Sequence, residues 1–490
     1  MNDPIRRLAY GILTIFAVLA VVATYTQAVA GPEYRDDPRN VRLAAFRTGR
    51  ERGAIVTADG TVVAVSQPDP DDPRSFRRSY PHRDLYGHVV GYTSVLFSST
   101  GLEKERARDL VSNRGSTISG VLDVVFGRDI GPRGLRLTIE HELQAAAAEA
   151  LGDQRGAIVA LDPATGAVLA MVSSPGFDPN TVIGRGAGSA GVALEQDPDR
   201  PLVDRAIEEV YPPGSTFKVI TTAAALESGV AGPSASFPDR LEQTLPGSTA
   251  TIRNFDRGRC GEGTEVTLAD AFVRSCNTVF AALGMQVGAE RLVTTAEAFG
   301  FNEEIPFDLP VVAARIPEAA SFSDDPAATA QNAIGQRDVV ATPMQMALVA
   351  AAVANDGTAM VPYVVDTVFT SDGRVEERTE PVPWRRAVSP ATAAVLAELM
   401  ERTVISGTAR RAAVPGVRIA GKTGTAEVTG GAPHAWFIGF APLDPEPGRR
   451  QIAVAVVVES GGVAGESASG GSVAAPIAAD LFREFLGLPG

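Results

Sequence analysis

The residues most able to carry chemistry lie in the segment Tyr211-Pro212-Pro213-Gly214-Ser215-Thr216-Phe217-Lys218. Prolines and a glycine end the preceding chain, serine is favoured at a helix start, and good helix formers follow. Ser215 and Lys218 then lie one turn apart on one helical face, so their side chains can meet. A serine hydroxyl becomes a nucleophile when a base takes its proton, and a desolvated lysine can be that base. The alternative is a serine that only caps a helix and a lysine that faces water.

Two further short motifs follow in the chain. Ser275-Cys276-Asn277 stands within a mostly apolar stretch, 266–283, where polar side chains need a reason to sit. Gly421-Lys422-Thr423-Gly424-Thr425 lies in a strand-like run, where glycines allow another backbone or a substrate to approach closely. Read separately, these are a polar turn or helix cap and an ordinary strand end. The order and separation of all three motifs within one domain are what indicate a single site.

The elements that must position these motifs can be predicted from periodicity. Strands are expected at 157–161, 168–172, 419–426, 436–441 and 452–458, and helices at 217–227, 268–285, 342–355 and 474–485. Strands therefore stand at both ends of the domain, with helices between them. This layout favours a sheet built from distant parts of the chain and covered by helices.

The segment before this domain has a different sequence pattern. Asp59-Gly60 between two apolar runs predicts a β-hairpin, and an alanine-rich helix over 142–151 closes the region. We therefore expect three parts: a tip and membrane anchor over 1–30, a small α+β domain over 31–150, and the domain with the three motifs over 151–490.

The N-terminal sequence is typical of a segment that enters a membrane. Arg6 and Arg7 precede an apolar run from Leu8 to Ala23, which favours an N-terminus inside the cell and a main body outside the cytoplasmic membrane. Two interpretations stay open. Ala28-Val29-Ala30 would suit a signal peptidase, whereas a continuation to residue 30 reaches the ~20 residues that span a bilayer.

Composition excludes some classes of function. A net charge of −14 and the lack of a basic cluster argue against a nucleic acid partner. The four histidines and two cysteines show no metal-ligand spacing, so we expect no metal and no other cofactor.

Taken together, Ser-x-x-Lys, Ser-x-Asn and Lys-Thr-Gly resemble the motifs of penicillin-recognising serine enzymes. The segments 156–163, 335–336, 342–347 and 435–442 resemble the transpeptidase subgroup, so the resemblance covers nearly all of 150–490. The apolar N-terminus, Arg52-Gly53 and the short first domain resemble a compact actinobacterial type of class B penicillin-binding protein. The implied fold is α+β, a mainly antiparallel sheet flanked by helices, with a small N-terminal α+β domain and a transmembrane helix.

The resemblance implies a role for each matching residue. Ser215 would attack the penultimate D-alanine of a stem peptide that ends in D-Ala-D-Ala, with Lys218 as the general base. Ser275 would relay a proton to the leaving amine, and Asn277 would hold Lys218 and the substrate backbone. The substrate carboxylate would bind the segment from Lys422 through Thr423 and Gly424 to Thr425, and β-lactams would acylate Ser215. The implied partners are the peptidoglycan stem peptides, the membrane and a separate glycan polymerase.

The cysteines suggest a further hypothesis. Cys276 stands inside the second motif and Cys260 lies sixteen residues earlier. Outside the cytoplasm such a pair can oxidise, and a loop of this size would be stabilised by about 3 kcal/mol. We hypothesise a disulfide; the alternative is two separate thiols.

Competing functions differ in the acceptor of the acyl group. A D,D-carboxypeptidase uses water, but the anchor and first domain favour the transferase. A serine β-lactamase needs a second base, and no glutamate falls in a recognisable deacylation motif. A non-catalytic scaffold would be expected to lose one of the three motifs. A β-lactam sensor would be expected to carry additional signalling domains.

Overall fold

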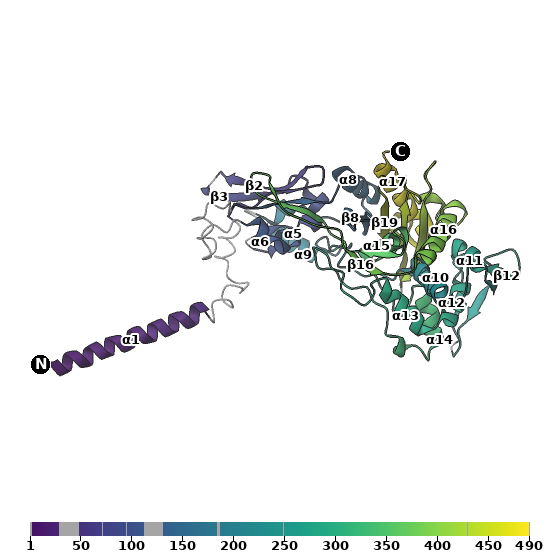
Figure 1. The fold of residues 1–490 in the computed structure, drawn as a ribbon, viewed down its shortest axis with the longest axis horizontal. Helices are drawn as coiled ribbons and strands as arrows, with labels where there is room; N and C mark the ends of the chain where they lie inside the picture. Colours follow the sequence, from purple (N-terminus) through teal and green to yellow (C-terminus); the bar gives the residue numbers. More distant parts are fainter. Residues whose placement is uncertain are drawn as a thin grey trace.

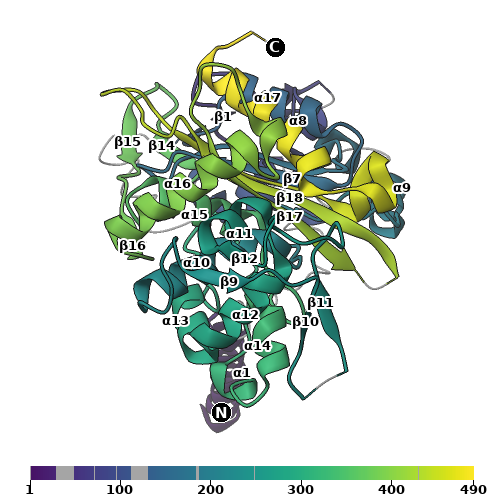
Figure 2. The ribbon, with the colours of Figure 1, turned by 90° about the vertical axis from the view of Figure 1, so that its right-hand side faces the viewer.

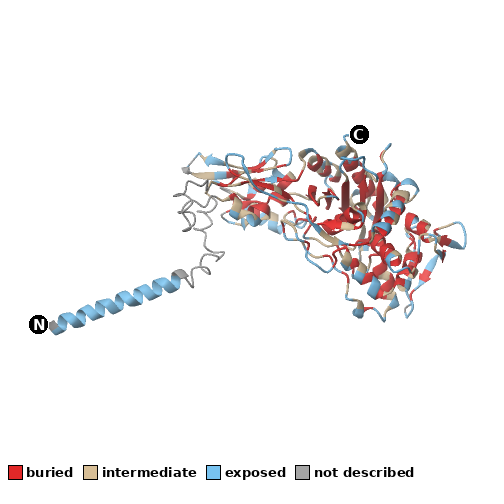
Figure 3. Cartoon of the chain, in the orientation of Figure 1, coloured by how far each residue is buried: buried red, intermediate tan, exposed pale blue. Residues whose placement is uncertain are grey.

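The computed structural model describes residues 2–28, 49–70, 72–94, 96–111, 131–183, 187–247, 249–428 and 430–489. Helix α1 (Asn2–Ala28) extends away from the rest of the chain, and its side chains over 3–26 are exposed (Figures 1 and 3). Its stretch Asp3–Thr26 is long and apolar enough to cross a membrane. Val29 and Ala30 of the cleavage motif, and the boundary expected at Gly31, lie outside the described residues.

In the described part of the chain, six strands form the sheet of the first region. Their order is β15 (Val375–Arg378), β14 (Val365–Phe369), β6 (Gly134–Leu137), β1 (Ile55–Val56), β2 (Val62–Asp69), β3 (Asp72–Ser79). The predicted hairpin at Asp59-Gly60 joins β1 to β2. The hairpin β14–β15 comes from the second half of the chain and pairs with β6, which the sequence did not indicate. The sheet is therefore built from both halves of the protein.

A buried ionic cluster lies beneath this sheet. The carboxylate of Glu103, on α5 (Gly101–Glu105), is 2.6 Å from the Nε atoms of both Arg52 and Arg78. The hydroxyl of Tyr80 donates to the same carboxylate at 3.3 Å. All four side chains are buried, so the two positive charges depend on Glu103 for compensation.

The second region is organised around an antiparallel sheet. Within the described residues its order is β17 (Ala420–Val428), β18 (Gly431–Ala441), β19 (Ile452–Val458), β7 (Gly156–Leu161), β8 (Val168–Ser174). The pairing of β19 with β7 joins the two ends of the domain, as predicted. Successive residues face opposite sides, so Val454 and Val456 lie in one apolar core while Ala455 and Val457 lie in the other.

Helices cover both faces of this sheet (Figures 1 and 2). α8 (His141–Leu151) and α17 (Ala475–Leu486) pack together on one face, and α15 (Pro343–Ala354) lies on the other. α16 (Pro390–Ser406) packs against β17 at the edge. α8 closes the first region in sequence, yet it packs mainly against β8 and α17 of the second, with smaller contacts to η1 (Arg83–Tyr86) of the first.

A helical subdomain lies beyond β17 and carries the first two motifs. It consists of α10 (Lys218–Glu227), α11 (Leu268–Arg274), α12 (Asn277–Val287), α13 (Ala289–Ala298) and α14 (Pro326–Ala333), with the antiparallel pair of β9 (Ser236–Pro238) and β12 (Glu265–Thr267) and the hairpin of β10 (Glu242–Thr244) and β11 (Thr251–Arg253). The prediction of one helix over 268–285 is wrong. Ser275 has a left-handed φ of +60°, which ends α11 and starts a new helix two residues later.

Short elements connect these parts. They are η1 (Arg83–Tyr86), α4 (Gly87–Val90), β4 (Thr93–Ser94), β5 (Ser98–Ser99), α6 (Ala107–Leu110), η2 (Pro179–Val182), α9 (Ala187–Gln196), η3 (Gly214–Phe217), η4 (Ala319–Ser321), β13 (Thr358–Met360), β16 (Pro383–Arg386), η5 (Arg410–Ala412), η6 (Glu459–Ser467) and η7 (Gly470–Ala474).

Candidate active site

Ser215 lies in the 3-10 turn η3, which leads directly into α10. Gly214 has a φ of +52°, and a Cβ at this position would lie 2.9 Å from the carbonyl oxygen of Thr425. Glycine therefore lets the turn approach β17 closely. The amide of Gly214 donates to the carbonyl of Gly335 at 2.9 Å, which fixes the turn from its other side. Among the described residues the Ser215 hydroxyl has no hydrogen-bond partner, so it is not a helix cap.

Lys218 is fully buried at the start of α10. Its Nζ donates to the Ser275 carbonyl at 2.8 Å, to the Ser275 hydroxyl at 3.3 Å and to Asn277 Oδ1 at 2.7 Å. Burial, and then the charge of Lys422, hold the pKa of Lys218 well below its usual value. Within the described chain no carboxylate pairs with this ammonium. Lys218 is thus a buried amine that readily becomes neutral, as a base requires.

The expected contact between Ser215 and Lys218 is not a hydrogen bond in the described structure. Lys218 instead reaches across to the loop between α11 and α12. Hydrogen bonds between catalytic groups are often absent without substrate and form in the bound complex. The helical spacing places Ser215 and Lys218 one turn apart. The Nζ of Lys218, however, donates its hydrogen bonds to Ser275 and Asn277 of the second motif.

Ser275 and Asn277 meet Lys218 because of the left-handed turn at Ser275. This turn directs the carbonyl and hydroxyl of Ser275 toward Lys218, while Asn277 begins α12. Asn277 is also held from outside, since its Nδ2 donates to the carbonyl of Arg253 on β11 at 3.0 Å. The helix break is therefore what brings the second motif to the first.

The third motif runs along β17, at the edge of the sheet. Lys422 is fully buried, and its Nζ donates to the Ser275 hydroxyl at 2.9 Å and to the Thr423 carbonyl at 3.0 Å. Burial lowers the pKa of Lys422 to about 7. The Ser275 hydroxyl consequently lies between two buried lysines, Lys218 and Lys422. Such a bridge is suited to moving a proton between amines.

Gly424 and Thr425 complete the approach of β17 to the nucleophile turn. A Cβ on Gly424 would lie 2.8 Å from the carbonyl oxygen of Pro213, so glycine is needed at this crossing. The hydroxyl of Thr425 accepts from the Gly470 amide at 3.3 Å. All three predicted motifs therefore meet between β17 and the helical subdomain.

Sequence reasoning missed two residues that contact this site. The hydroxyl of Thr408 lies 2.5 Å from that of Thr423, and the indole of Trp436 donates to the Pro212 carbonyl at 3.0 Å. Trp436 lies in the segment 435–442 that resembles the transpeptidase subgroup, but the sequence assigned it no role. Thr408 follows α16 in a loop with no recognisable pattern, so only the fold places it.

The two cysteines are joined by a disulfide, with Cα atoms 5.9 Å apart. Cys276 immediately precedes α12 and is fully buried. Cys260 lies in the loop between β11 and β12, so the bond ties that loop to the second motif.

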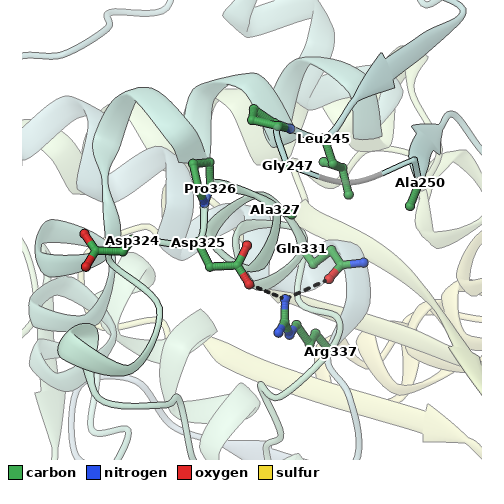
Figure 4. Close-up of a pocket in the computed structure, with 10 residues that line it drawn as sticks. Leu245, Gly247, Ala250, Asp324, Asp325, Pro326, Ala327, Gln331 and Arg337 are labelled. Atoms are coloured by element: carbon green, nitrogen blue, oxygen red, sulfur yellow. Dashed lines mark hydrogen bonds and ion pairs between the residues drawn. The ribbon is translucent and has the colours of Figure 1, made fainter.

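The cavity in Figure 4 is separate from this constellation. It has a volume of about 480 Å³ and lies between the loop of the β10–β11 hairpin and the start of α14. Arg337 in its wall pairs with Asp325 at 3.3 Å and donates to Gln331 at 3.4 Å. None of the three motifs lines it.

Comparison with known proteins agrees with this geometry. Residues 156–483 match the penicillin-binding protein transpeptidase domain, and residues 52–131 match the penicillin-binding protein A dimerisation domain. The chain belongs to the class B penicillin-binding proteins. The resemblance predicted from the three motifs is confirmed, and so is the α+β fold.

Individual relatives of this penicillin-binding protein match over nearly their whole length. Peptidoglycan D,D-transpeptidase PbpA of Mycolicibacterium smegmatis is 44% identical over 97% of each chain. The ceftriaxone acyl-enzyme complex of penicillin-binding protein A from M. tuberculosis is 39% identical, with a TM-score of 0.82 over 90% of this chain and 99% of that one. A chain of a peptidoglycan synthase complex that coordinates polymerisation and cross-linking is 25% identical, with a TM-score of 0.73 over 100% and 99%.

Proposed function

We propose that this protein is a peptidoglycan D,D-transpeptidase that cross-links stem peptides through an acyl-enzyme on Ser215. The observation that carries the proposal is the Ser275 hydroxyl held between two buried lysines beside the nucleophile turn. This arrangement supplies a base and a proton path without any metal or histidine. The 44% identical relative is named a peptidoglycan D,D-transpeptidase, which supports the same activity here.

The first half-reaction begins with proton transfer from Ser215 to neutral Lys218. The Ser215 oxygen attacks the carbonyl carbon of the penultimate D-alanine, and the amides of Ser215 and Thr425 stabilise the oxyanion. The bond to the terminal D-alanine then breaks, and its nitrogen receives the proton from Lys218 through Ser275. The product is an ester of Ser215 and a free D-alanine.

The second half-reaction uses an amine of a neighbouring stem peptide. This amine attacks the ester carbonyl, a new amide bond forms, and the proton lost by the amine returns to Ser215. Asn277 holds Lys218 throughout, and the cation of Lys422 with the hydroxyls of Thr423 and Thr425 binds the terminal carboxylate. A β-lactam carries a carboxylate and a reactive amide, so it acylates the same serine.

The cellular setting follows from the sequence pattern. The apolar helix and the family indicate a membrane-anchored protein. We place its N-terminus inside the cell and its main body outside the cytoplasmic membrane. Digestion of the main body by protease added to intact spheroplasts, with α1 protected, tests this orientation. The region 31–150 serves as a pedestal and partner surface, and a separate membrane glycan polymerase is the expected partner.

Labelling with a fluorescent penicillin tests the central proposal. Wild-type protein should form a long-lived adduct of the drug's mass, and Ser215→Ala should form none. An intact drug without an adduct would favour a scaffold, whereas a hydrolysed drug without an adduct would favour a β-lactamase. Cross-linked dimers made from stem-peptide substrates identify the transferase; release of D-alanine without dimers identifies the carboxypeptidase.

A further inference from the structure

A second buried ionic cluster lies directly behind the nucleophile turn. Glu459, which immediately follows β19, accepts hydrogen bonds on Oε1 from the Tyr211 hydroxyl at 2.7 Å and from Arg205 Nε at 2.8 Å. Its Oε2 pairs with Arg155 at 2.8 Å. Tyr211, Arg205 and Glu459 are all at least nine-tenths buried. The motifs of the proposed reaction do not include any of these residues.

The ionic cluster is linked to Ser215 by the short backbone segment 211–214, whose groups are held by hydrogen bonds. Tyr211 exchanges two backbone hydrogen bonds with Ala341, at 3.0 and 2.9 Å. The Pro212 carbonyl is held by the Trp436 indole, and the Gly214 amide by the Gly335 carbonyl. Tyr211 is thus the one residue of 211–214 whose polar side chain ties the turn to Glu459, the residue that follows β19.

Neighbouring rings fix the orientation of the Tyr211 side chain. Its ring makes edge contacts with His434, at 5.3 Å between centroids, and with Trp436, at 6.0 Å. Glu459 anchors the hydroxyl at the end of this ring. Burial opposes ionisation of Glu459, but the hydrogen bond from Tyr211 and the charges of Arg205 and Arg155 hold its pKa below the usual value. The anchor is therefore a carboxylate with two cationic partners.

Stability alone does not explain such a cluster. Buried ion pairs are often matched or exceeded in stability by apolar residues of similar volume, because taking charges out of water is costly. Directional hydrogen bonds supply something that apolar packing does not, a defined position for the group that they hold. In this protein that group is the residue four positions before the nucleophile.

We infer that Glu459 and Tyr211 are positioning residues for Ser215, holding the nucleophile turn in register with β17. The inference rests on the proposed acylation of Ser215. A displacement of about 1 Å in a reacting group can lower a rate by about 100-fold, so removing the anchor should slow acylation. Because neither residue belongs to the proposed substrate contacts, noncovalent affinity should change little.

The first domain offers a matched control. Tyr80, like Tyr211, is a buried tyrosine that donates to a buried glutamate flanked by two arginines, but it lies in the cluster around Glu103. Tyr211→Phe and Tyr80→Phe each remove one such hydroxyl. Both full-length proteins, in detergent, are compared with wild type for the rate constant of penicillin acylation and for Tm. Binding of the same penicillin is measured with Ser215→Ala added to each.

Tyr211→Phe should acylate at least about 10-fold more slowly, with unchanged binding in the Ser215→Ala background, while Tyr80→Phe should acylate at the wild-type rate. An unchanged rate in Tyr211→Phe overturns the inference, as does an equal loss in Tyr80→Phe. If Tyr211→Phe does not fold, Glu459→Gln takes its place with the same two outcomes. A wild-type protein that forms no adduct instead refutes the proposed function itself.

Discussion

Replacing Lys422 with methionine should stabilise the fold while removing the carboxylate site. Burial lowers the pKa of this lysine from 10.5 to about 7, which corresponds to about 5 kcal/mol at 1.36 kcal/mol per unit. Methionine has a similar length and no charge. The variant loses two hydrogen bonds from Lys422 Nζ, to Ser275 and Thr423, each worth about 1 kcal/mol. The expected net gain at pH 7 is about 2–3 kcal/mol.

The lowered pKa of Lys422 also determines how the stability difference between wild type and Lys422→Met changes with pH. The folded pKa lies below the unfolded one, so between pH 7 and 10.5 the unfolded wild type binds more protons. The contribution of Lys422 should therefore make the free energy of unfolding of the wild-type protein rise with pH across this window. Below about pH 7 the full destabilisation is present. The advantage of Lys422→Met should consequently be largest below pH 7 and shrink toward pH 10.5.

Urea unfolding of full-length protein in detergent at pH 6.5, 8 and 9.5 tests this expectation. Tryptophan fluorescence is a suitable probe, because Trp436 lies on β18, the strand paired with β17. Lys104→Met, at an exposed lysine of α5, is the control and should show no such pH-dependent gain. A Lys422→Met protein that is less stable than wild type at all three pH values would refute the reasoning from burial.

Three further predictions concern the same chain. In Ser215→Ala protein, the affinity for penicillin should fall by up to about 10-fold per unit above pH 7 as Lys422 loses its cation, and calorimetry showing a flat affinity would contradict this. Thiol titration of denatured, unreduced wild type should find no free thiol, and the double change Cys260→Ser with Cys276→Ser should cost about 3 kcal/mol in urea unfolding; two free thiols would refute the bond. Glu103→Gln should cost about 3–5 kcal/mol because it leaves two buried arginines uncompensated, and a loss below 1 kcal/mol would count against that cluster.

The sequence predicted the parts of the site whose signals are local. Ser215, Lys218 and Lys422 stand in short patterns, and the strands around them have clear apolar runs. The break at Ser275 was missed although the residues around it are polar, because the apolar runs on both sides have helical spacing and together favour one helix. Thr408 and Glu459 were missed for another reason. Thr408 contacts Thr423, 15 residues later, and Glu459 contacts Tyr211, 248 residues earlier, and no local pattern distinguishes either from any other polar residue.

The hairpin β14–β15 has a consequence for how this protein can be divided. Removing residues 31–150 would take away β1, β2, β3 and β6 and leave β14 with an unpaired edge. An exposed strand edge invites pairing with other chains, so such a truncated protein should self-associate. A chimera that exchanges first domains between relatives would need to carry residues 365–378 along with them. The contiguous segment 31–150 therefore cannot be exchanged between relatives on its own.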